Sequence, residues 1–193
     1  MTEKIMKCLA LLMFSLIFGC ASKPVTHHYY LIEGPASDTV INSNQQIVLY
    51  PIELSDYLRS ISLHVKSNSG EILYSATDSW AEQPDKMLWR AIRQNLEKNT
   101  GHHVLTSFEA SSDCAQIKIR INELSPNTTG QVVSNGRWFI NTENKILKTN
   151  TFSFTGNINV DGYSASNQIF ADHLNALSAE LNEQIRQLGL CQK

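Results

Sequence analysis

The sequence has no hydrophobic run long enough to cross a membrane. Its most apolar stretch, residues 8–18 near the N-terminus, is 11 residues long. A transmembrane helix requires roughly 20 predominantly apolar residues to cross the bilayer core. We therefore do not expect a permanent membrane-spanning helix.

An excess of positive charge is also missing. The chain holds 16 lysines and arginines against 18 aspartates and glutamates, and its basic residues are scattered. Neutralising nucleic-acid phosphates or anionic lipid headgroups requires a clustered basic surface. The composition therefore argues against a nucleic-acid-binding protein and against a polybasic lipid-binding patch.

The sequence shows no convergent set of catalytic or metal-ligating residues. His27–His28 and His102–His103 are adjacent pairs, and neighbouring residues on a strand point to opposite faces, so neither pair is expected to hold one metal ion. Asp172–His173 has no plausible serine partner at a strained elbow, which disfavours a hydrolase triad. We expect no catalytic and no metal site, so an enzyme is the least favoured class.

The N-terminus does contain the parts of a bacterial lipoprotein signal. Two lysines, the short apolar run and a small residue precede Cys20, an order typical of a removable export signal. A cysteine at the cut site favours the lipoprotein pathway, because its sulfur carries the lipid. The residue two before the cysteine is usually small or β-branched, whereas here it is Phe18. The alternative is an ordinary secretory signal cut near Ala21.

The predicted cut defines three segments. Residues 1–19 would be a removed signal peptide, residues 20–28 a lipidated polar tether, and residues 29–193 a single periplasmic domain. The remaining 174 residues carry 14 basic and 17 acidic side chains, a net charge of −3, and are enough for one core. The tether is short, so the folded domain should lie close to the membrane surface.

Two cysteines remain after removal of Cys8 with the signal and lipidation of Cys20. An exported protein usually joins such a pair, so we predict a disulfide between Cys114 and Cys191. A metal site at these two cysteines is disfavoured, because no other histidine or cysteine lies at ligand spacing.

The pattern of the domain predicts strands alternating with two long helices. A helical turn capped by Ser55 is expected at residues 54–59, and long amphipathic helices are expected at 84–99 and 165–188. Segments rich in β-branched and aromatic residues, or alternating in polarity, predict strands: 28–32, 46–52, 62–66, 71–76, 104–107, 114–123, 131–142 and 148–160. Residues 38–45 are polar and are expected to form a loop.

These elements predict an α/β (α+β) sandwich, with a mixed, mainly antiparallel sheet that carries two long helices. The last three strands should form an antiparallel meander with one wet face. In the first of them Ile117, Ile119 and Ile121 share the core face. Pro51 has no N–H to donate, so strand pairing should end there or lie at an edge.

Three tryptophans offer large apolar surfaces. We expect Trp80 to pack in the core. Trp89, beside the apolar stripe of the first long helix, and Trp138, on a strand with bulky groups on both faces, are candidates for contact with another subunit or a partner.

In these features the chain resembles the PqiC (YmbA) family, the auxiliary lipoproteins of ABC-type transport systems that accompany MCE-domain proteins. Five ordered segments carry the resemblance: IFGC at Cys20, HYYLIEG, IVLYPIELSDYLRS, SWAEQPDKMLWRAIRQNLEKNTG, and the meander before the last helix. It covers residues 17–190. The family has no catalytic motif to transfer, and Cys20 is the one residue that takes over a chemical role.

The resemblance implies a lipoprotein of the outer membrane that faces the periplasm, with no cofactor beyond the covalent lipid, such as palmitate, on Cys20. It also implies an MCE-domain envelope-spanning partner and a ring-like homo-oligomer at the end of a lipid path. Ala21, rather than Asp, after the cysteine fits sorting to the outer membrane. We therefore expect a non-enzymatic docking component that contributes to envelope integrity. The alternative is a monomeric periplasmic lipid- or ligand-binding lipoprotein.

Overall fold

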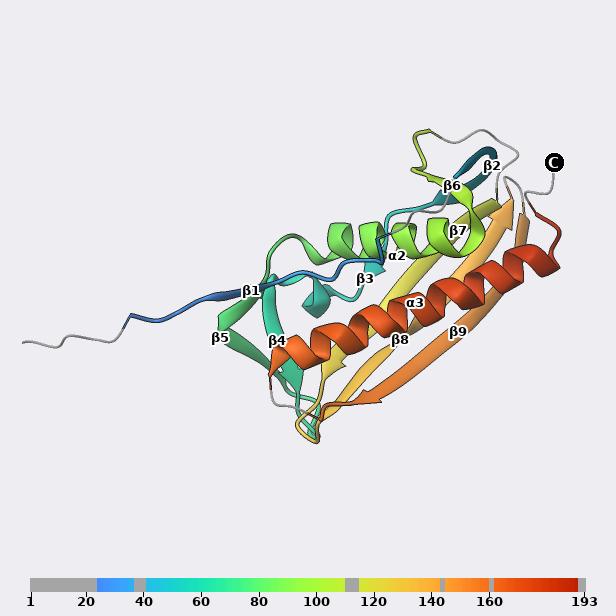
Figure 1. Ribbon diagram of the computed structural model, residues 1–193. Coiled ribbons are helices and arrows are strands. Elements are labelled where there is room, and N and C mark those ends of the chain that lie inside the picture. Colours follow the sequence, from blue (N-terminus) through green and yellow to red (C-terminus); the bar gives the residue numbers. More distant parts are fainter. Residues whose placement is uncertain (1–23, 37–40, 110–114, 143–144, 160–161, 191–193) are drawn as a thin grey trace, which may run out of the picture.

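The computed structural model describes residues 24–36, 41–109, 115–142, 145–159 and 162–190. Two long helices, α2 and α3, lie side by side on one face of the long strands, and a smaller sheet lies at one end of them (Figure 1). The elements are β1 (His28–Tyr30), β2 (Asn42–Leu49), β3 (Glu53–Leu54), η1 (Asp56–Arg59), β4 (Ser62–Lys66), β5 (Ile72–Trp80), α2 (Pro84–Thr100), β6 (His102–Leu105), β7 (Ala115–Pro126), β8 (Gln131–Thr142), β9 (Lys145–Asn157) and α3 (Tyr163–Gln187). The predicted α+β class is confirmed.

The six-stranded sheet has the order β6-β2-β7-β8-β9, with β3 also paired to β7. Strand β2 runs parallel to both of its neighbours, whereas β7, β8 and β9 form the predicted antiparallel meander. Ile117, Ile119 and Ile121 are at most 1% exposed, so they share the core face as predicted. The two faces of β7 thus differ as its alternating sequence requires.

Strand β2 begins and ends earlier than the predicted segment 46–52, but its relation to Pro51 is the expected one. It ends at Leu49, before Pro51, as expected for a residue without an N–H. It begins at Asn42, inside the segment predicted as a loop. The backbone N–H of Asn42 donates to the carbonyl of Gly101 at 2.8 Å, so pairing beside β6 extends the strand through polar residues.

Helix α2 has sequence-encoded boundaries. Pro84 occupies its first turn, where its missing N–H costs nothing. Gly101 ends it with a left-handed φ of 69°, and its N–H donates to the carbonyl of Glu97. The buried stripe contains Leu88 and Ile92, each 0% exposed.

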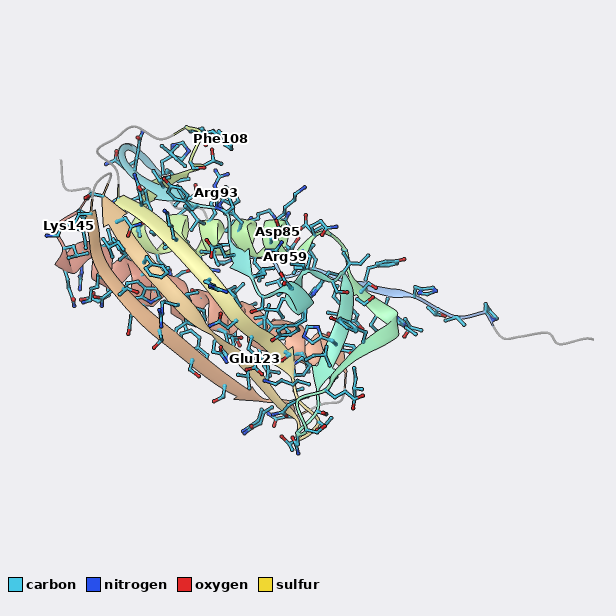
Figure 2. All side chains as sticks on the ribbon, turned by 180° about the vertical axis from the view of Figure 1, so that it is seen from behind. Arg59, Asp85, Arg93, Phe108, Glu123 and Lys145 are labelled. Atoms are coloured by element: carbon cyan, nitrogen blue, oxygen red, sulfur yellow. The ribbon has the colours of Figure 1, made fainter. Side chains whose placement is uncertain are left out.

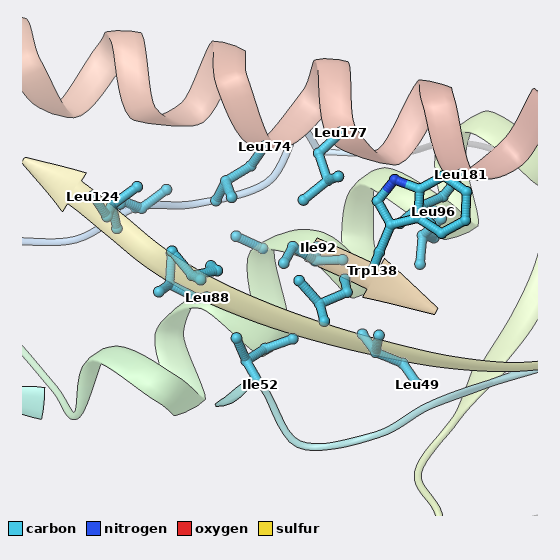
Figure 3. Packing of buried hydrophobic residues seen from close by; sticks show 14 of the residues in the cluster. Leu49, Ile52, Leu88, Ile92, Leu96, Leu124, Trp138, Leu174, Leu177 and Leu181 are labelled. Atoms are coloured by element: carbon cyan, nitrogen blue, oxygen red, sulfur yellow. The ribbon is translucent and has the colours of Figure 1, made fainter. Parts of the chain in front are cut away.

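Helix α3 lays its apolar stripe on the sheet and on α2. Figure 3 shows Leu174, Leu177 and Leu181 directed from α3 toward the side chains of α2 and the strands. Each of the three is at most 2% exposed. Trp80 is also buried, 7% exposed, and its ring lies 6.2 Å from that of Phe170, which confirms its predicted place in the core.

The three-stranded sheet has the order β1-β5-β4 and was not foreseen as separate. Strand β1 pairs in parallel with β5, through the register His28↔Asp78 to Tyr30↔Trp80. Strands β4 and β5 form the predicted hairpin, whose turn uses Gly70 at φ 87°. The expected capping by the Ser55 side chain is absent: its carbonyl oxygen accepts from the Leu58 N–H at 2.9 Å, and η1 is a single 3-10 turn.

Candidate functional site

An apolar cleft lies between α2, the chain that follows β2, and the turn that follows β6. Its volume is about 310 Å³, and its lining joins residues far apart in the sequence: Leu49, Pro51, Ile52, Asp85, Lys86, Trp89, Thr106, Ser107 and Phe108. Figure 2 labels two of them, Asp85 on α2 and Phe108 on the turn after β6. Proline, isoleucine and aromatic side chains give the cleft an apolar wall, and Asp85, Lys86, Thr106 and Ser107 add polar groups to its lining.

Trp89 is held as a fixed wall of this cleft. Its indole Nε1 donates to the carbonyl of Leu49 at 3.1 Å, which ties α2 to the end of β2. The Arg93 guanidinium lies 5.7 Å from the centroid of the Trp89 ring, a cation–π distance. Arg93 is itself positioned by an ion pair with Glu97 at 3.0 Å. The indole is therefore held at its N–H edge by Leu49 and contacted on its face by Arg93.

Phe108 projects from a turn that Glu109 organises. A Glu109 carboxylate oxygen accepts the Thr106 N–H at 2.9 Å and the Thr106 hydroxyl at 2.8 Å. These hydrogen bonds hold the pKa of Glu109 below its ordinary value. The Phe108 side chain is 98% exposed, although a phenyl ring gains free energy by leaving water. This turn thus presents an aromatic group beside an apolar cleft.

Two opposite charges flank the cleft without an ion pair in the described part of the chain. They are Asp85 and Lys86, both exposed in the first turn of α2. By contrast, nearby Arg90 pairs with both carboxylate oxygens of Glu82, which lowers the Glu82 pKa and raises that of Arg90. Lys86 attracts Glu82 without pairing with it, and both Asp85 and Lys86 are exposed beside the cleft, where a bound molecule could meet their charges.

The described residues of the cleft offer an apolar surface for contact. Within the described residues, no group of three or more histidine, cysteine, aspartate or glutamate side chains could hold a metal ion. An apolar cleft with fixed aromatic walls suits the burial of an apolar side chain or ligand.

The structure gives His173 a serine partner that the sequence did not suggest. The Ser134 hydroxyl lies 2.8 Å from His173 Nδ1, across the contact of β8 with α3. The two side chains are 2% and 8% exposed, and burial lowers the His173 pKa. A substrate cannot reach a serine enclosed between sheet and helix. We therefore interpret this pair as a structural contact that joins α3 to the sheet.

The adjacent histidine pairs lie at strand starts. His102 and His103 open β6, and the Nδ1 atom of His102 contacts the Thr100 carbonyl at 3.0 Å. His27 precedes β1, and His28 is its first residue.

The two tryptophans predicted as interface candidates have different environments. Trp89 lines the cleft described above. Trp138 is 0% exposed, and its Nε1 donates to a Glu180 carboxylate oxygen at 3.1 Å. In the folded chain Trp138 is therefore a core residue, whose ring presents no surface to a partner.

The predicted lipidation and disulfide residues, Cys20, Cys114 and Cys191, lie outside the described residues. Sequence reasoning also missed Phe108. Its signal was a lone aromatic residue in a polar stretch, Thr106 to Ser112, where burial is not expected. None of the helices in the described ranges is long and apolar enough to span a bilayer.

Comparisons with known proteins bear on the family and the fold of this chain. A family model described as "ABC-type transport auxiliary lipoprotein component" matches residues 29–185. No curated protein matches the sequence. A solved structure described as an uncharacterized protein has a TM-score of 0.73 at 20% identity and covers 83% of this chain and 99% of its own. A Xanthomonas campestris protein of the family-model DUF330 has a TM-score of 0.65 at 14% identity, covering 82% and 93%.

The two solved structures, at these identities, show a shared fold. The family match shows more than the fold, because it covers residues 29–185, from the first strand nearly to the end of α3. The chain belongs to the family of ABC-type transport auxiliary lipoprotein components.

Proposed function

We propose that this protein is a non-enzymatic, lipid-anchored docking subunit of an MCE-type intermembrane lipid-transport complex. It would face the periplasm from the outer membrane, form a ring-like homo-oligomer, bind an MCE-domain envelope-spanning protein and so contribute to envelope integrity. The observation that carries this proposal is the family match, which spans nearly all of the described domain and leaves the cysteine-containing signal upstream of it.

The anchor in this proposal is a lipid on Cys20. A single acyl chain binds a membrane only marginally, while several chains on one residue anchor it stably. Anchoring confines all copies to one surface and raises their effective concentration, which favours self-association and partner binding without any new contact. Ala21 after the cysteine supports sorting to the outer membrane.

The docking contact in this proposal is the cleft beside Trp89. Interfaces depend on a few aromatic anchors that become fully desolvated, and Phe108 is an exposed aromatic group next to an apolar cleft. The charges of Asp85 and Lys86 at its flank can orient a partner, since rim charges act mainly on association and specificity. Rigid support of Trp89 by Leu49 means little ordering is needed on binding.

Membrane fractionation of cysteine variants tests the anchor. Cys20→Ala should shift the protein from the membrane fraction to the soluble fraction, because the lipid attachment site is lost. The matched control is Cys8→Ala, which changes a cysteine inside the signal and should leave fractionation unchanged. Membrane association of Cys20→Ala equal to that of the wild type would refute the anchor.

Co-purification with the MCE-domain protein tests the docking site. Phe108→Ser should reduce recovery of that protein, because the exposed ring is removed from the edge of the cleft. The control is Ile146→Ser, which removes another exposed apolar side chain, 59% exposed, from the start of β9. Equal recovery with both variants would place the docking contact elsewhere.

The Cys114–Cys191 disulfide remains part of the proposal. It would tie the end of the chain, beyond α3, to the residue just before β7. Titration of thiols in the denatured, unreduced mature protein should find neither cysteine free. Two titratable sulfhydryls would exclude the bond.

A second candidate, a monomeric ligand-binding lipoprotein, is favoured by the volume of the cleft. At about 310 Å³ it reaches the lower end of the range of small-molecule sites, roughly 300–1,000 Å³. Native mass spectrometry separates the two candidates. A closed oligomer without ligand supports the docking subunit, whereas a monomer carrying co-purified lipid supports the binding protein.

A further inference from the structure

Exposed apolar side chains gather at the end of the molecule where the chain enters the fold. In the described part of the chain, the large apolar side chains that are exposed include five in or beside the β1-β5-β4 sheet: Val25, Tyr29, Ile61, Leu73 and Tyr74. Three others are dispersed, near the starts of β2 and β9 and after β6. The small sheet and its surroundings therefore carry apolar side chains that the fold itself does not cover.

Two of these residues, Tyr29 and Tyr74, share one face of the small sheet. Tyr29 is the neighbour of Ser79 on β5, and Ser79 is the neighbour of Ser62 on β4. The pairing register shifts between Ser62 and His64, so the two tyrosines are placed separately. Tyr29 points away from α3, because the next residue, Tyr30, contacts Tyr163 of that helix. Val65, the neighbour of Leu73, lines a pocket with Tyr163, so the adjacent residues His64 and Tyr74 point to the opposite face, away from α3.

Tyr74 is held in this outward position. Its hydroxyl donates to the Tyr57 carbonyl at 3.2 Å. Beneath it lies the buried His64 ring, which makes edge contacts with both Tyr57 and Tyr74 at centroid distances of 5.3 and 5.7 Å. Tyr74 is nevertheless 48% exposed, and Tyr29 is 69% exposed. The sheet presents them as an amphipathic aromatic pair.

The one carboxylate at the β1–β5 pairing has its charge satisfied within the protein. Asp78 accepts hydrogen bonds from the hydroxyls of Ser75 and Thr77, each at 2.8 Å, and of Tyr30 at 3.2 Å. These bonds hold its pKa below the ordinary value. A satisfied carboxylate opposes contact with an apolar or interfacial environment less than a free one does.

This surface also lies next to the start of the domain. Cys20 precedes Tyr29 by nine residues, and an extended chain covers at most about 3.5 Å per residue, so a lipid on Cys20 keeps Tyr29 within roughly 30 Å of the membrane. Figure 1 shows the segment before β1 leaving the body at the small sheet, with α3 and the long strands extending away from it.

We propose that the exposed end of the β1-β5-β4 sheet rests on the bilayer, with Tyr29 and Tyr74 at the level of the lipid headgroups. This inference depends on the lipid anchor of the proposed function. Tyrosine suits this depth because its ring is apolar and its hydroxyl is polar. The contact fixes the orientation of the domain: the long strands and α3 point away from the membrane, and the cleft at Trp89 stays in the aqueous space.

Nitration of tyrosines by tetranitromethane, mapped by mass spectrometry, tests this contact in the full lipidated protein. The protein is bound to phosphatidylethanolamine–phosphatidylglycerol vesicles and carries Phe108→Tyr as an exposed internal reference. The comparison is the same variant with Cys20→Ala in buffer. We expect nitration of Tyr29 and Tyr74 to slow by about tenfold on vesicles, since headgroups screen an interfacial ring from water. The residue at position 108 should react equally in both samples.

Three other outcomes contradict the inference and differ from one another. If Tyr29 and Tyr74 react equally fast on vesicles and in buffer, the small sheet does not touch the bilayer, although the anchor stands. If both tyrosines are already protected in the unlipidated protein, a second copy of the chain covers them instead. If the Cys20-containing protein does not float with the vesicles, the anchor of the proposed function fails and the contact fails with it.

Discussion

The two sheets of this molecule are covered to very different degrees. On the six-stranded sheet, Ile117, Trp138 and Ile140 are each 0% exposed, because α2 and α3 lie across that face. On the three-stranded sheet, by contrast, Tyr29 and Tyr74 keep about half or more of their surfaces in water. The same chain therefore closes one apolar surface and leaves another open.

This difference suggests different roles: the covered sheet stabilises the fold, and the exposed side chains of the small sheet are available for contact. Burying a large apolar side chain contributes about 1.5–3 kcal/mol, so the helix-covered face holds most of the free energy of folding. Exposed apolar groups add little to that free energy and remain available to a membrane or partner. Changes in the large sheet should therefore unfold the protein, and changes at the exposed end of the small sheet should alter only what it touches.

The largest expected effect is that of Trp138→Ala. Removing this ring leaves a cavity under α3 and takes the indole hydrogen bond from Glu180, so the free energy of unfolding should fall by about 3–5 kcal/mol. Urea denaturation measures the change. Trp138→Phe is the control, because it keeps part of the ring volume and should lose less. A small loss for Trp138→Ala would mean that the large sheet is not the stable part.

Gly136→Ala probes the same sheet through backbone packing. A Cβ atom on residue 136 would lie 2.1 Å from the Arg120 carbonyl oxygen and 2.8 Å from the Phe152 ring, so β8 must move away from β7. Overpacking of this kind costs about 1–3 kcal/mol, and thermal unfolding should detect it. Thr151→Ala, on the exposed face of β9, is the matched change and should have little effect. Equal melting temperatures would show that β7 and β8 are not tightly fixed.

Much of the covered region could be predicted from the sequence. Helix α2 and the meander carry strong periodic patterns, with Pro84, Gly101 and the alternating isoleucines of β7 defining them locally. The existence of β1 was predicted as well. Its pairing with β5 was not, because register between segments about 50 residues apart is decided by tertiary contacts that no local pattern encodes.

The sites on the surface were harder to predict. Trp89 and Trp138 both lie among apolar neighbours in the sequence, and only the position of α3 decides that Trp138 is enclosed while Trp89 lines a cleft. The exposure of Phe108 was equally hard to predict, because it depends on the turn that Glu109 holds. Sequence patterns indicate which side chains are apolar, and packing decides which of them remain open.

The two sheets can also be compared through the pH dependence of stability, because each is in contact with a buried histidine or contains one. Burial lowers the pKa of His64, on strand β4 of the small sheet, and of His173, on α3 against the large sheet. Below the unfolded value of about 6.5, the unfolded chain binds more protons, so the free energy of unfolding should fall as pH falls. His64→Phe keeps the aromatic contacts and should flatten this dependence in urea titrations from neutral to acidic pH. An unchanged slope would assign the effect to other groups, His173 first.

The smallest expected effect is that of Tyr29→Ser. Its side chain is 69% exposed, so the free energy of unfolding should stay within about 0.5 kcal/mol of the wild type, as for most surface changes. Urea denaturation of Tyr29→Ser and Trp138→Ala under the same conditions compares the two losses of free energy directly. A loss as large as that of Trp138→Ala would show that the small sheet depends on this ring for folding. An unchanged free energy leaves Tyr29 free for an external contact, because a ring that contributes nothing to the fold can enter the headgroups without destabilising it.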